Sequence, residues 1–342
     1  MGASRPGPLR RLQGVARDVA ARVERRAARR FGDLELQQLR ALERAYGRKR
    51  GPELLVIGHS QLFYRGRDEP DTRPVVEMLR DELGGRVKIL SLGGPGYNQR
   101  LTAAYLSALP DLRSRPEVVI VTIHPVLAGP MWYDSPRLGY EKAAEGIRAA
   151  IAAGRDRPRR LEKPSAEDWD RYDRRPAPSL TGARRTMGEL TLMVNSRPTT
   201  RYQEEVRLRH RVDFYYADHL EPDDPGVRMS AEVGRMLKEM GIPSIALLSA
   251  INYEAAVRMV GDGVVDHIRR NGQIVEQAYQ DAVGDTGTVL NCCFDCRDEE
   301  FSDPLHHKQD ARLRLARQLA AVVRPHLEQP APSPAPVAIA TS

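Results

Sequence analysis

From Glu53 onward the sequence alternates continuous apolar runs with longer amphipathic segments, and this alternation limits the possible folds more than any other feature. Apolar runs of this kind are typical of parallel strands buried on both faces, because the helices that connect them cover both sides of the sheet. We therefore predict an α/β fold with a three-layer α/β/α parallel sheet of about five strands. The predicted strands are 53–58, 86–93, 116–125, 242–251 and 288–294, and the predicted helices are 73–85, 99–112, 231–241, 264–282 and 310–327.

Residues 130–225 interrupt this alternation. The segment is rich in Arg and Pro and contains both tryptophans of the chain, Trp132 and Trp169. We predict a largely helical insertion within a main domain that spans residues 51–327, acting as a lid or as an acceptor-binding subdomain. A mobile linker is the alternative interpretation. The Pro/Ala-rich tail, residues 328–342, is predicted to be disordered.

Residues 1–50 form a basic segment. They hold 14 of the 53 basic side chains and only 5 of the 46 acidic ones, so the rest of the chain is slightly acidic. Apolar residues recur there at helical spacing, which predicts a basic helical N-terminal arm. Such an arm suggests a polyanionic partner, for example a nucleic acid or an anionic membrane surface. A solvated helix without a partner is the alternative. The apolar positions are Leu12, Val15, Val19 and Val23, followed after Gly32 by Leu36, Leu39 and Leu42.

Membrane and secretory classes are not favoured by the apolar runs. The longest run has fewer than about ten residues, against roughly 20 for a membrane helix, and the N-terminus lacks the apolar region of a secretory signal. The three cysteines, Cys292, Cys293 and Cys296, have no distant partner, which favours a reducing, cytoplasmic location. A single Cys-x-x-Cys pair is weak support for a zinc or redox site, so no metal or cofactor is predicted.

The stretch "LLVIGHSQLFYRG" places Ser60 at the carboxyl end of the first predicted strand, where parallel sheets bind ligands. A serine becomes a nucleophile when a base accepts its proton and donors stabilise the resulting oxyanion. The stretch "FSDPLHH" offers Asp303 and His306 just before the last helix, at a spacing that lets the carboxylate orient the imidazole. His307 is the adjacent alternative base. We predict that Ser60 and His306 meet above the carboxyl edge of the sheet.

Structural roles are the alternative for each of these residues. Ser60 could cap the helix that follows its strand, and Asp303 could cap the last helix. His124, which precedes Pro125 at the end of the third strand, could satisfy a buried backbone group.

Together these segments resemble the SGNH, or GDSL-type, hydrolase family. That family has a G-D-S block after its first strand, where this chain has Gly58, His59 and Ser60. Its second block is a glycine after the second strand, and "SLGGPGYNQ" is similar, pointing to Gly93. Its last block, D-x-x-H, matches "FSDPLHH". The blocks occur in the family's order between about residues 53 and 327, and the resemblance implies a flavodoxin-like sheet.

The resemblance implies a role for each matched residue. Ser60 would be the nucleophile and His306 the base oriented by Asp303, with the backbone N–H groups of Ser60 and Gly93 in the oxyanion hole. The family's third block supplies an asparagine after the third strand, and this chain has none there. His124 is the nearest substitute donor and Asn98 a second candidate. His59 in place of the usual aspartate is a further departure from the family pattern.

The function implied is acyl transfer through an acyl-enzyme on Ser60, with water or a small-molecule acceptor taking the acyl group from an ester. One variant is an acyltransferase whose donor is a polyanion such as an aminoacyl-tRNA, bound by the basic arm. An alternative of a different class is an inactive SGNH-like binding module, which the missing asparagine favours.

Overall fold

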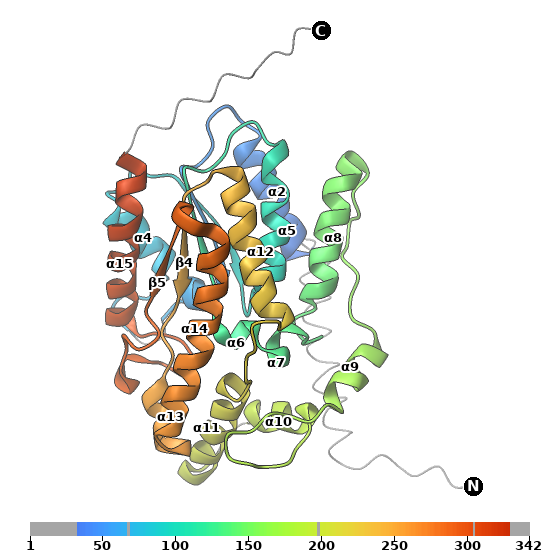
Figure 1. Ribbon diagram of the computed structural model, residues 1–342, viewed down its shortest axis with the longest axis vertical. Helices are drawn as coiled ribbons and strands as arrows, with labels where there is room; N and C mark the ends of the chain where they lie inside the picture. Colours follow the sequence, from blue (N-terminus) through green and yellow to red (C-terminus); the bar gives the residue numbers. More distant parts are fainter. Residues whose placement is uncertain (1–32, 67–68, 197–198, 304, 329–342) are drawn as a thin grey trace, which may run out of the picture.

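The computed structural model describes residues 33–66, 69–196, 199–303 and 305–328. Within these residues a five-stranded sheet has the order β2-β1-β3-β4-β5, and every neighbouring pair is parallel (Figure 1). This confirms the predicted α/β fold, and the strand order is the flavodoxin-like one. The strands are β1 (Leu54–His59), β2 (Ile89–Gly94), β3 (Val118–Thr122), β4 (Ser244–Leu248) and β5 (Gly287–Asn291).

Successive residues of the central strands pack into two different helical layers. In β1, Leu55 and Ile57 join the apolar core under α5, α12 and α14, whereas Leu54 and Val56 join the core under α4 and α15. Figure 1 shows these two sets of helices on opposite sides of the strands. Burial on both faces explains why these strands are continuous apolar runs. The helices are α4 (Val75–Glu82), α5 (Gln99–Leu106), α12 (Pro225–Met240), α14 (Gly263–Val283) and α15 (Gln309–Glu328).

The helix bounds differ from the prediction in places, and α5 ends at Leu106, six residues before the predicted end. Helix α12 begins at Pro225, six residues before the predicted start, at a position where proline is favoured because its missing N–H is not needed. A separate helix, α13 (Tyr253–Val260), lies between β4 and α14. None of these differences changes the order or direction of the strands.

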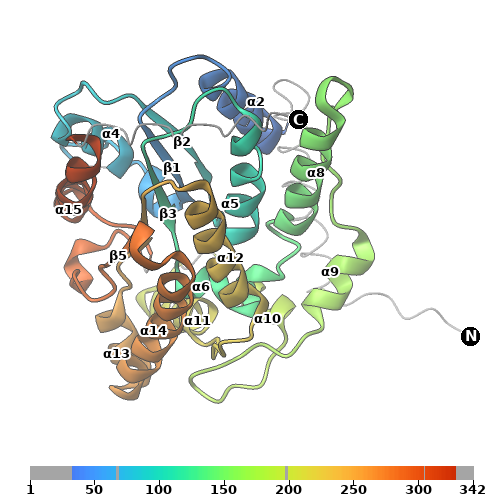
Figure 2. The same ribbon diagram turned by 45° about the horizontal axis from the view of Figure 1, so that its top comes forward.

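The segment 130–225 is mainly helical, and its helices pack in two ways. Helix α8 contributes Tyr140 and Ile147 to the main core beside α5. The other helices share a small core of their own that includes Leu190 and Phe214. Figures 1 and 2 show α10 and α11 at the end of the molecule where β3 and β4 finish. The helices are α7 (Pro130–Tyr133), α8 (Tyr140–Ala153), α9 (Ala166–Asp173), α10 (Met187–Val194) and α11 (Arg201–Tyr216).

The N-terminal segment is only partly described. The predicted second helix is present as α2 (Leu34–Tyr46), with Leu36, Leu39 and Leu42 buried. The predicted basic helix before Gly32 and the tail from Gln329 lie outside the described residues. Among the helices that are described, none has both the length and the apolar character needed to cross a lipid bilayer.

Candidate active site

Ser60 lies at the point where β1 ends and a short helical turn, α3 (Ser60–Phe63), begins. The turn closes through a 2.6 Å hydrogen bond from the Tyr64 backbone N–H to the Ser60 carbonyl. The N-cap of α3 is His59, whose Nδ1 accepts the Gln61 N–H at 3.3 Å. Ser60 therefore does not cap this helix, and its hydroxyl is available for another partner.

That partner is His306, which lies 246 residues further along the chain. Nε2 of His306 is 2.9 Å from Oγ of Ser60, and Nδ1 of the same ring is 2.9 Å from Oδ2 of Asp303. The loop that carries both residues is held by an antiparallel bridge between Phe301 and His307. The structure thus brings together the hydroxyl, imidazole and carboxylate that the sequence analysis had grouped.

The carboxylate of Asp303 accepts hydrogen bonds from the backbone of its own loop and does not cap the last helix. Its Oδ1 accepts the backbone N–H groups of Leu305 and His306, both at 2.9 Å, whereas α15 begins only at Gln309. Burial opposes ionisation of this carboxyl, but the hydrogen bonds from His306 and the backbone outweigh it and lower the pKa of Asp303 to about 2. The carboxylate is therefore charged at neutral pH and fixes the orientation of the His306 ring.

Three more histidines surround this site and are held neutral. Burial is the main cause that lowers the pKa of His59 well below its ordinary value, and the neighbouring histidines add to it. Burial lowers the pKa of His124 to about 3 and that of His307 to about 4. The rings of His59 and His124 meet edge to face at 5.3 Å between centroids. A neutral imidazole has one N–H donor, and its position depends on the other nitrogen.

His124 and Asn98 each present a buried donor with no hydrogen-bond partner among the described residues. Nδ1 of His124 accepts the Val126 N–H at 3.2 Å, so the proton of the neutral ring is on Nε2. Oδ1 of Asn98 accepts the Arg100 N–H at 3.1 Å, which leaves its Nδ2 group free to donate. Both Nε2 of His124 and Nδ2 of Asn98 are buried and unpaired. Buried donors of this kind are rare and call for an explanation.

The strand order places these two residues on either side of Ser60. Asn98 follows β2, His124 follows β3, and β1, which leads to Ser60, pairs with both strands. All three strands are parallel, so the three residues follow carboxyl ends at the same edge of the sheet. His124 does satisfy a backbone N–H, as the structural interpretation expected, but only through Nδ1.

Gly93 lies in β2, opposite Gly58 of β1. A Cβ at Gly93 would collide with the ring of Phe63 and with the Gly58 carbonyl oxygen. Close packing therefore explains the absence of a side chain at this position. The role of the Gly93 N–H in an oxyanion hole stays a prediction.

Sequence reasoning missed Gln61, the residue after Ser60. Its carboxamide is buried, and Nε2 donates to the carbonyls of Ala250 at 3.0 Å and Leu305 at 2.7 Å. Its Oε1 accepts the hydroxyl of Ser249, which also lies 3.3 Å from Nε2 of His59. These hydrogen bonds join residues about 190 to 240 positions apart, and no periodicity in the sequence marks them.

The insertion approaches the site through its last helix, α11. Burial, and after it the nearby Asp303 carboxylate, raise the pKa of Tyr215 to about 12. Tyr215 stacks on Trp132 with their ring centroids 5.5 Å apart. The Asp303 carboxylate thus acts on Tyr215 and on its neighbour Tyr216 at the end of α11.

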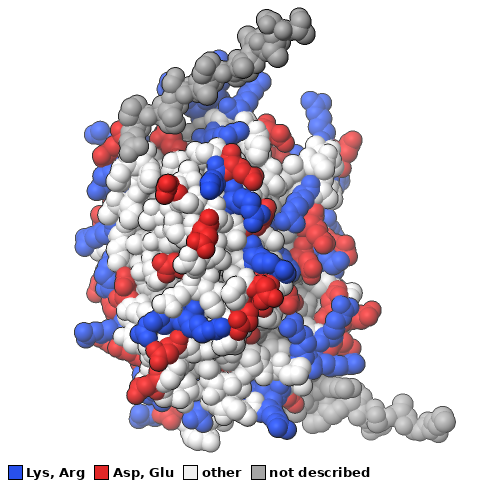
Figure 3. Space-filling view, viewed as in Figure 1, with Lys and Arg blue, Asp and Glu red and all other residues white. Residues whose placement is uncertain are grey.

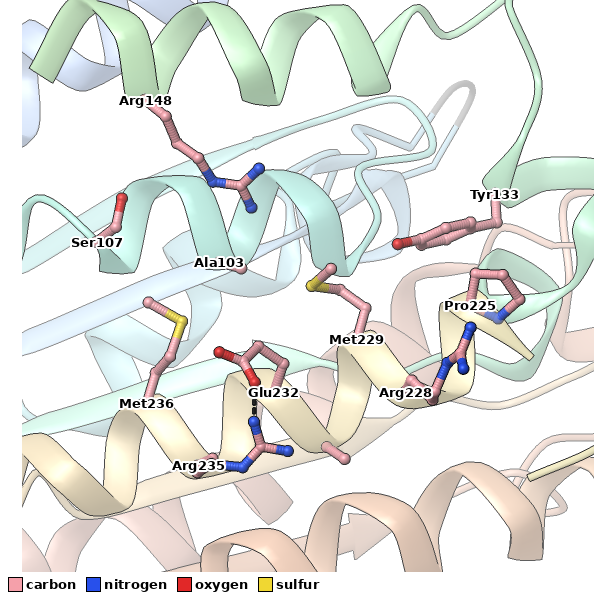
Figure 4. Close-up of a pocket in the computed structure, with 11 residues that line it drawn as sticks. Ala103, Ser107, Tyr133, Arg148, Pro225, Arg228, Met229, Glu232, Arg235 and Met236 are labelled. Carbon is pink, nitrogen blue, oxygen red and sulfur yellow. Dashed lines mark hydrogen bonds and ion pairs between the residues drawn. The ribbon is translucent and has the colours of Figure 1, made fainter. Parts of the chain in front are cut away.

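A groove of about 670 Å³ lies elsewhere, between α5, α8 and α12 (Figure 4). Its lining includes Ala103, Tyr133, Arg148, Arg228, Met229 and Met236, and it contains an ion pair between Arg235 and Glu232. None of the residues that hold Ser60, Asp303 and His306 together lines this groove. On the face shown in Figure 3, basic and acidic side chains are interspersed.

The cysteines show no sign of a metal or redox site in the part of the chain that is described. Cys292, Cys293 and Cys296 are buried and unbridged, and burial raises the pKa of Cys293 above its ordinary range. No cluster of three or more His, Cys, Asp or Glu side chains among the described residues is placed to hold a metal ion. Cys293 packs in the main apolar core, whereas the Cys292 thiol donates to Oε1 of Gln318 at 3.7 Å and the Cys296 sulfur accepts from Arg314 at 3.3 Å.

Comparisons with known proteins give only distant similarity. No family model and no curated protein matches the sequence. Among solved structures, LAE5, an alpha/beta hydrolase enzyme from the metagenome of Lake Arreo, Spain, is 14% identical with a TM-score of 0.39, over 82% of this chain and 98% of its own. Axe2, an acetylxylan esterase from Geobacillus stearothermophilus, is 14% identical with a TM-score of 0.36, over 82% and 95%. Similarity at this level assigns neither a reaction nor a substrate to this chain.

Proposed function

We propose that this protein is a serine acyl-transfer enzyme that works through an acyl-enzyme on Ser60. The observation that carries the proposal is the line of hydrogen bonds from Ser60 Oγ to His306 Nε2 and from His306 Nδ1 to Asp303. A proton on Nδ1, held by the ionised carboxylate, leaves Nε2 free to accept the hydroxyl proton. This is the arrangement that makes a serine nucleophilic at neutral pH.

The reaction follows from these positions. Oγ of Ser60 attacks the carbonyl carbon of an ester while its proton moves to Nε2 of His306, and the carbonyl oxygen becomes an oxyanion. When the tetrahedral intermediate collapses, the ester C–O bond breaks and the leaving alcohol takes the proton from Nε2. Water, or another alcohol or amine, then attacks the acyl-serine while its proton moves to Nε2 of His306. The second tetrahedral intermediate collapses, the bond between the acyl carbon and Ser60 Oγ breaks, and Nε2 returns the proton to Oγ.

The oxyanion needs donors, and four are proposed for it. Two are the backbone N–H groups of Ser60 and Gly93. The other two are the unpaired side-chain donors, Nε2–H of His124 and Nδ2 of Asn98. A neutral imidazole with a strongly lowered pKa suits this role, because it donates a hydrogen bond without giving up a full proton. His124 would then replace the asparagine that the chain lacks after its third strand.

The choice between hydrolysis and transfer depends on what reaches the acyl-serine. Exclusion of water from the site would favour transfer to a bound acceptor. The nearness of Tyr215 to Asp303 supports a role for the insertion in shaping that access.

A burst experiment tests the proposal. Excess p-nitrophenyl acetate should release close to one nitrophenolate per chain rapidly, and mass spectrometry of acid-quenched protein should find an acetyl group on Ser60. Ser60→Ala should abolish both signals. Ser107→Ala is the matched control, because Ser107 lines the separate groove and should leave both signals intact. Equal signals from the two variants would refute a role for Ser60.

A further inference from the structure

The turn that carries Ser60 also contacts the loop that carries His306, the proposed base, at two points. The turn is short, with α3 ending at Phe63 and Tyr64 directly after it. Gln61, one residue after Ser60, donates to the carbonyl of Leu305, one residue before His306. Tyr64, four residues after Ser60, lies against the imidazole of His306 itself.

The contact of Gln61 is rigid because its carboxamide is fully used. Nε2 donates both hydrogens, to the carbonyls of Ala250 and Leu305, and Oε1 accepts from Ser249. The side chain is 1% exposed, so water does not compete for these bonds. A buried and fully satisfied amide fixes the distance between the segments that it joins. Gln61 therefore sets how far the loop of the base stands from the turn of the nucleophile.

The contact of Tyr64 sets the plane of the base. Its ring centroid is 4.4 Å from that of His306, and the two planes are 20° apart. Stacking at this distance restricts rotation of the imidazole about its own axis. It also favours the positively charged ring that forms when His306 takes the serine proton, because an aromatic face attracts a cation.

We propose that the turn Ser60–Tyr64 fixes the position of the base, His306, relative to the nucleophile. Gln61 and Tyr64 act as positioning residues. The hydrogen bonds that Nδ1 of His306 donates to Asp303 fix one edge of the imidazole, but both residues belong to the same loop, so these bonds do not set the distance from that loop to Ser60. The turn sets that distance by holding the loop backbone through Gln61 and the ring through Tyr64. The consequence for turnover rests on the proposed function, whereas the contacts themselves do not.

Tyr64→Leu tests the stacking, with Tyr64→Phe as the conservative partner that keeps the ring. If the protein catalyses the proposed reaction, we expect Tyr64→Leu to lower kcat about 2- to 10-fold with little change in KM. Tyr64→Phe should behave as wild type. Equal values of kcat for the Leu and Phe variants would overturn the role of Tyr64.

Gln61→Met tests the backbone contact, because methionine keeps the length of the side chain but donates to neither carbonyl. A displacement of the base by about 1 Å costs on the order of 100-fold in rate, so we expect a fall of roughly 10- to 100-fold in kcat. Ser249→Ala is the matched control, as it removes the hydroxyl beside Oε1 and leaves the bond to Leu305 intact. Equal losses in both variants would assign the effect to general disruption of the site.

A readout independent of activity separates this inference from the proposed function. In full-length protein with labelled histidine, the ring signals of His306, assigned with His306→Gln, should carry a ring-current shift from Tyr64. Tyr64→Phe should preserve that shift and Tyr64→Leu should remove it, whether or not the chain turns over an ester. His306 signals that are identical in the Leu variant and in wild type would overturn the inference even if the burst experiment succeeds.

Discussion

Two regions of the molecule contain conspicuous polar side chains, and they are built in opposite ways. At the carboxyl edge of the sheet, Ser60, His306 and Asp303 meet through hydrogen bonds of 2.9 Å, with buried histidines around them. In the groove between α5, α8 and α12, Arg148 and Arg228 are exposed, beside methionines and a surface ion pair (Figure 4). The groove has the solvated cations, and the edge has the directed interactions.

The difference shows that a surface groove and a set of side chains aligned by hydrogen bonds need not lie in the same place in this fold. Groups at the edge come from the ends of separate strands, so the parallel sheet itself aims them at a common point. Groups in the groove come from the outer faces of helices, where long side chains remain solvated and a single ion pair contributes little. If this comparison is right, substitutions at the edge should abolish ester turnover, and substitutions in the groove should change it little.

The largest effect is expected at the base. His306→Gln should lower ester turnover by about 10⁴–10⁶-fold, because the hydroxyl of Ser60 then has no group to take its proton. His307→Gln should stay within about tenfold of wild type, since His307 packs against Phe301, with ring centroids 5.0 Å apart. Steady-state kinetics with a short-chain ester measures both variants. The reverse order of effects would move the base to His307.

A smaller loss is expected at the proposed oxyanion donor. Removal of one such donor costs about 10²–10³-fold in kcat in enzymes where it has been tested. His124→Leu should show that loss, and His124→Gln, which keeps an N–H donor, should recover part of it. Thermal unfolding of each variant checks that the fold persists. If His124→Leu turns over ester as wild type does, the oxyanion is stabilised elsewhere.

Lowering the pH should reduce the stability of the folded chain through the buried histidines at the edge of the sheet. The residues that line the groove include no histidine. His59, His124 and His307 have lowered pKa values in the folded chain, so below about pH 6.5 the unfolded chain binds more protons. Stability should therefore fall as pH drops from about 6.5 to 4, by up to about 1.4 kcal/mol per pH unit for each histidine. Asp218 opposes this in part, since burial raises its pKa to about 6.

Urea unfolding at pH 7.5 and pH 5 measures the difference in stability directly. The free energy of unfolding should be lower at pH 5. A value that is unchanged or higher would mean that the buried histidines are not neutral in the folded chain.

The smallest effect is expected in the groove. The double variant Arg148→Ala/Arg228→Ala removes two exposed cations, neither of which contacts the site at the edge of the sheet. Turnover of a neutral ester should stay within about twofold of wild type, and the free energy of unfolding within about 0.5 kcal/mol. A tenfold loss in turnover would break the comparison and make the groove part of the substrate site.

The sequence was sufficient to predict the sheet, because buried parallel strands leave an apolar signature that needs no knowledge of tertiary contacts. It also predicted which residues follow the strand ends, and therefore that Ser60, Asp303 and His306 could meet. Their catalytic roles stay predictions. The start of α12 at Pro225 had a local signal, Asp followed by Pro, that was not used.

Other parts of the site had no signal in the sequence. Gln61 and Ser249 act through hydrogen bonds between distant segments, and polar residues in such positions resemble those of any loop. Arg312 is more misleading, because an arginine in an amphipathic helix is expected on its exposed face. It is fully buried, and it donates to the carbonyls of Asp71, Arg73 and His307. Only the folded chain shows that these polar groups are satisfied.

Covalent labelling with a fluorophosphonate tests the central claim most directly, because the reagent reacts with a serine only when a base activates it. Wild-type protein should gain one phosphonyl group, located by peptide mass spectrometry on Ser60, and His306→Gln should react far more slowly. Heat-unfolded protein should not react. A folded wild-type chain that stays unlabelled, or that is labelled at another residue, would contradict the account.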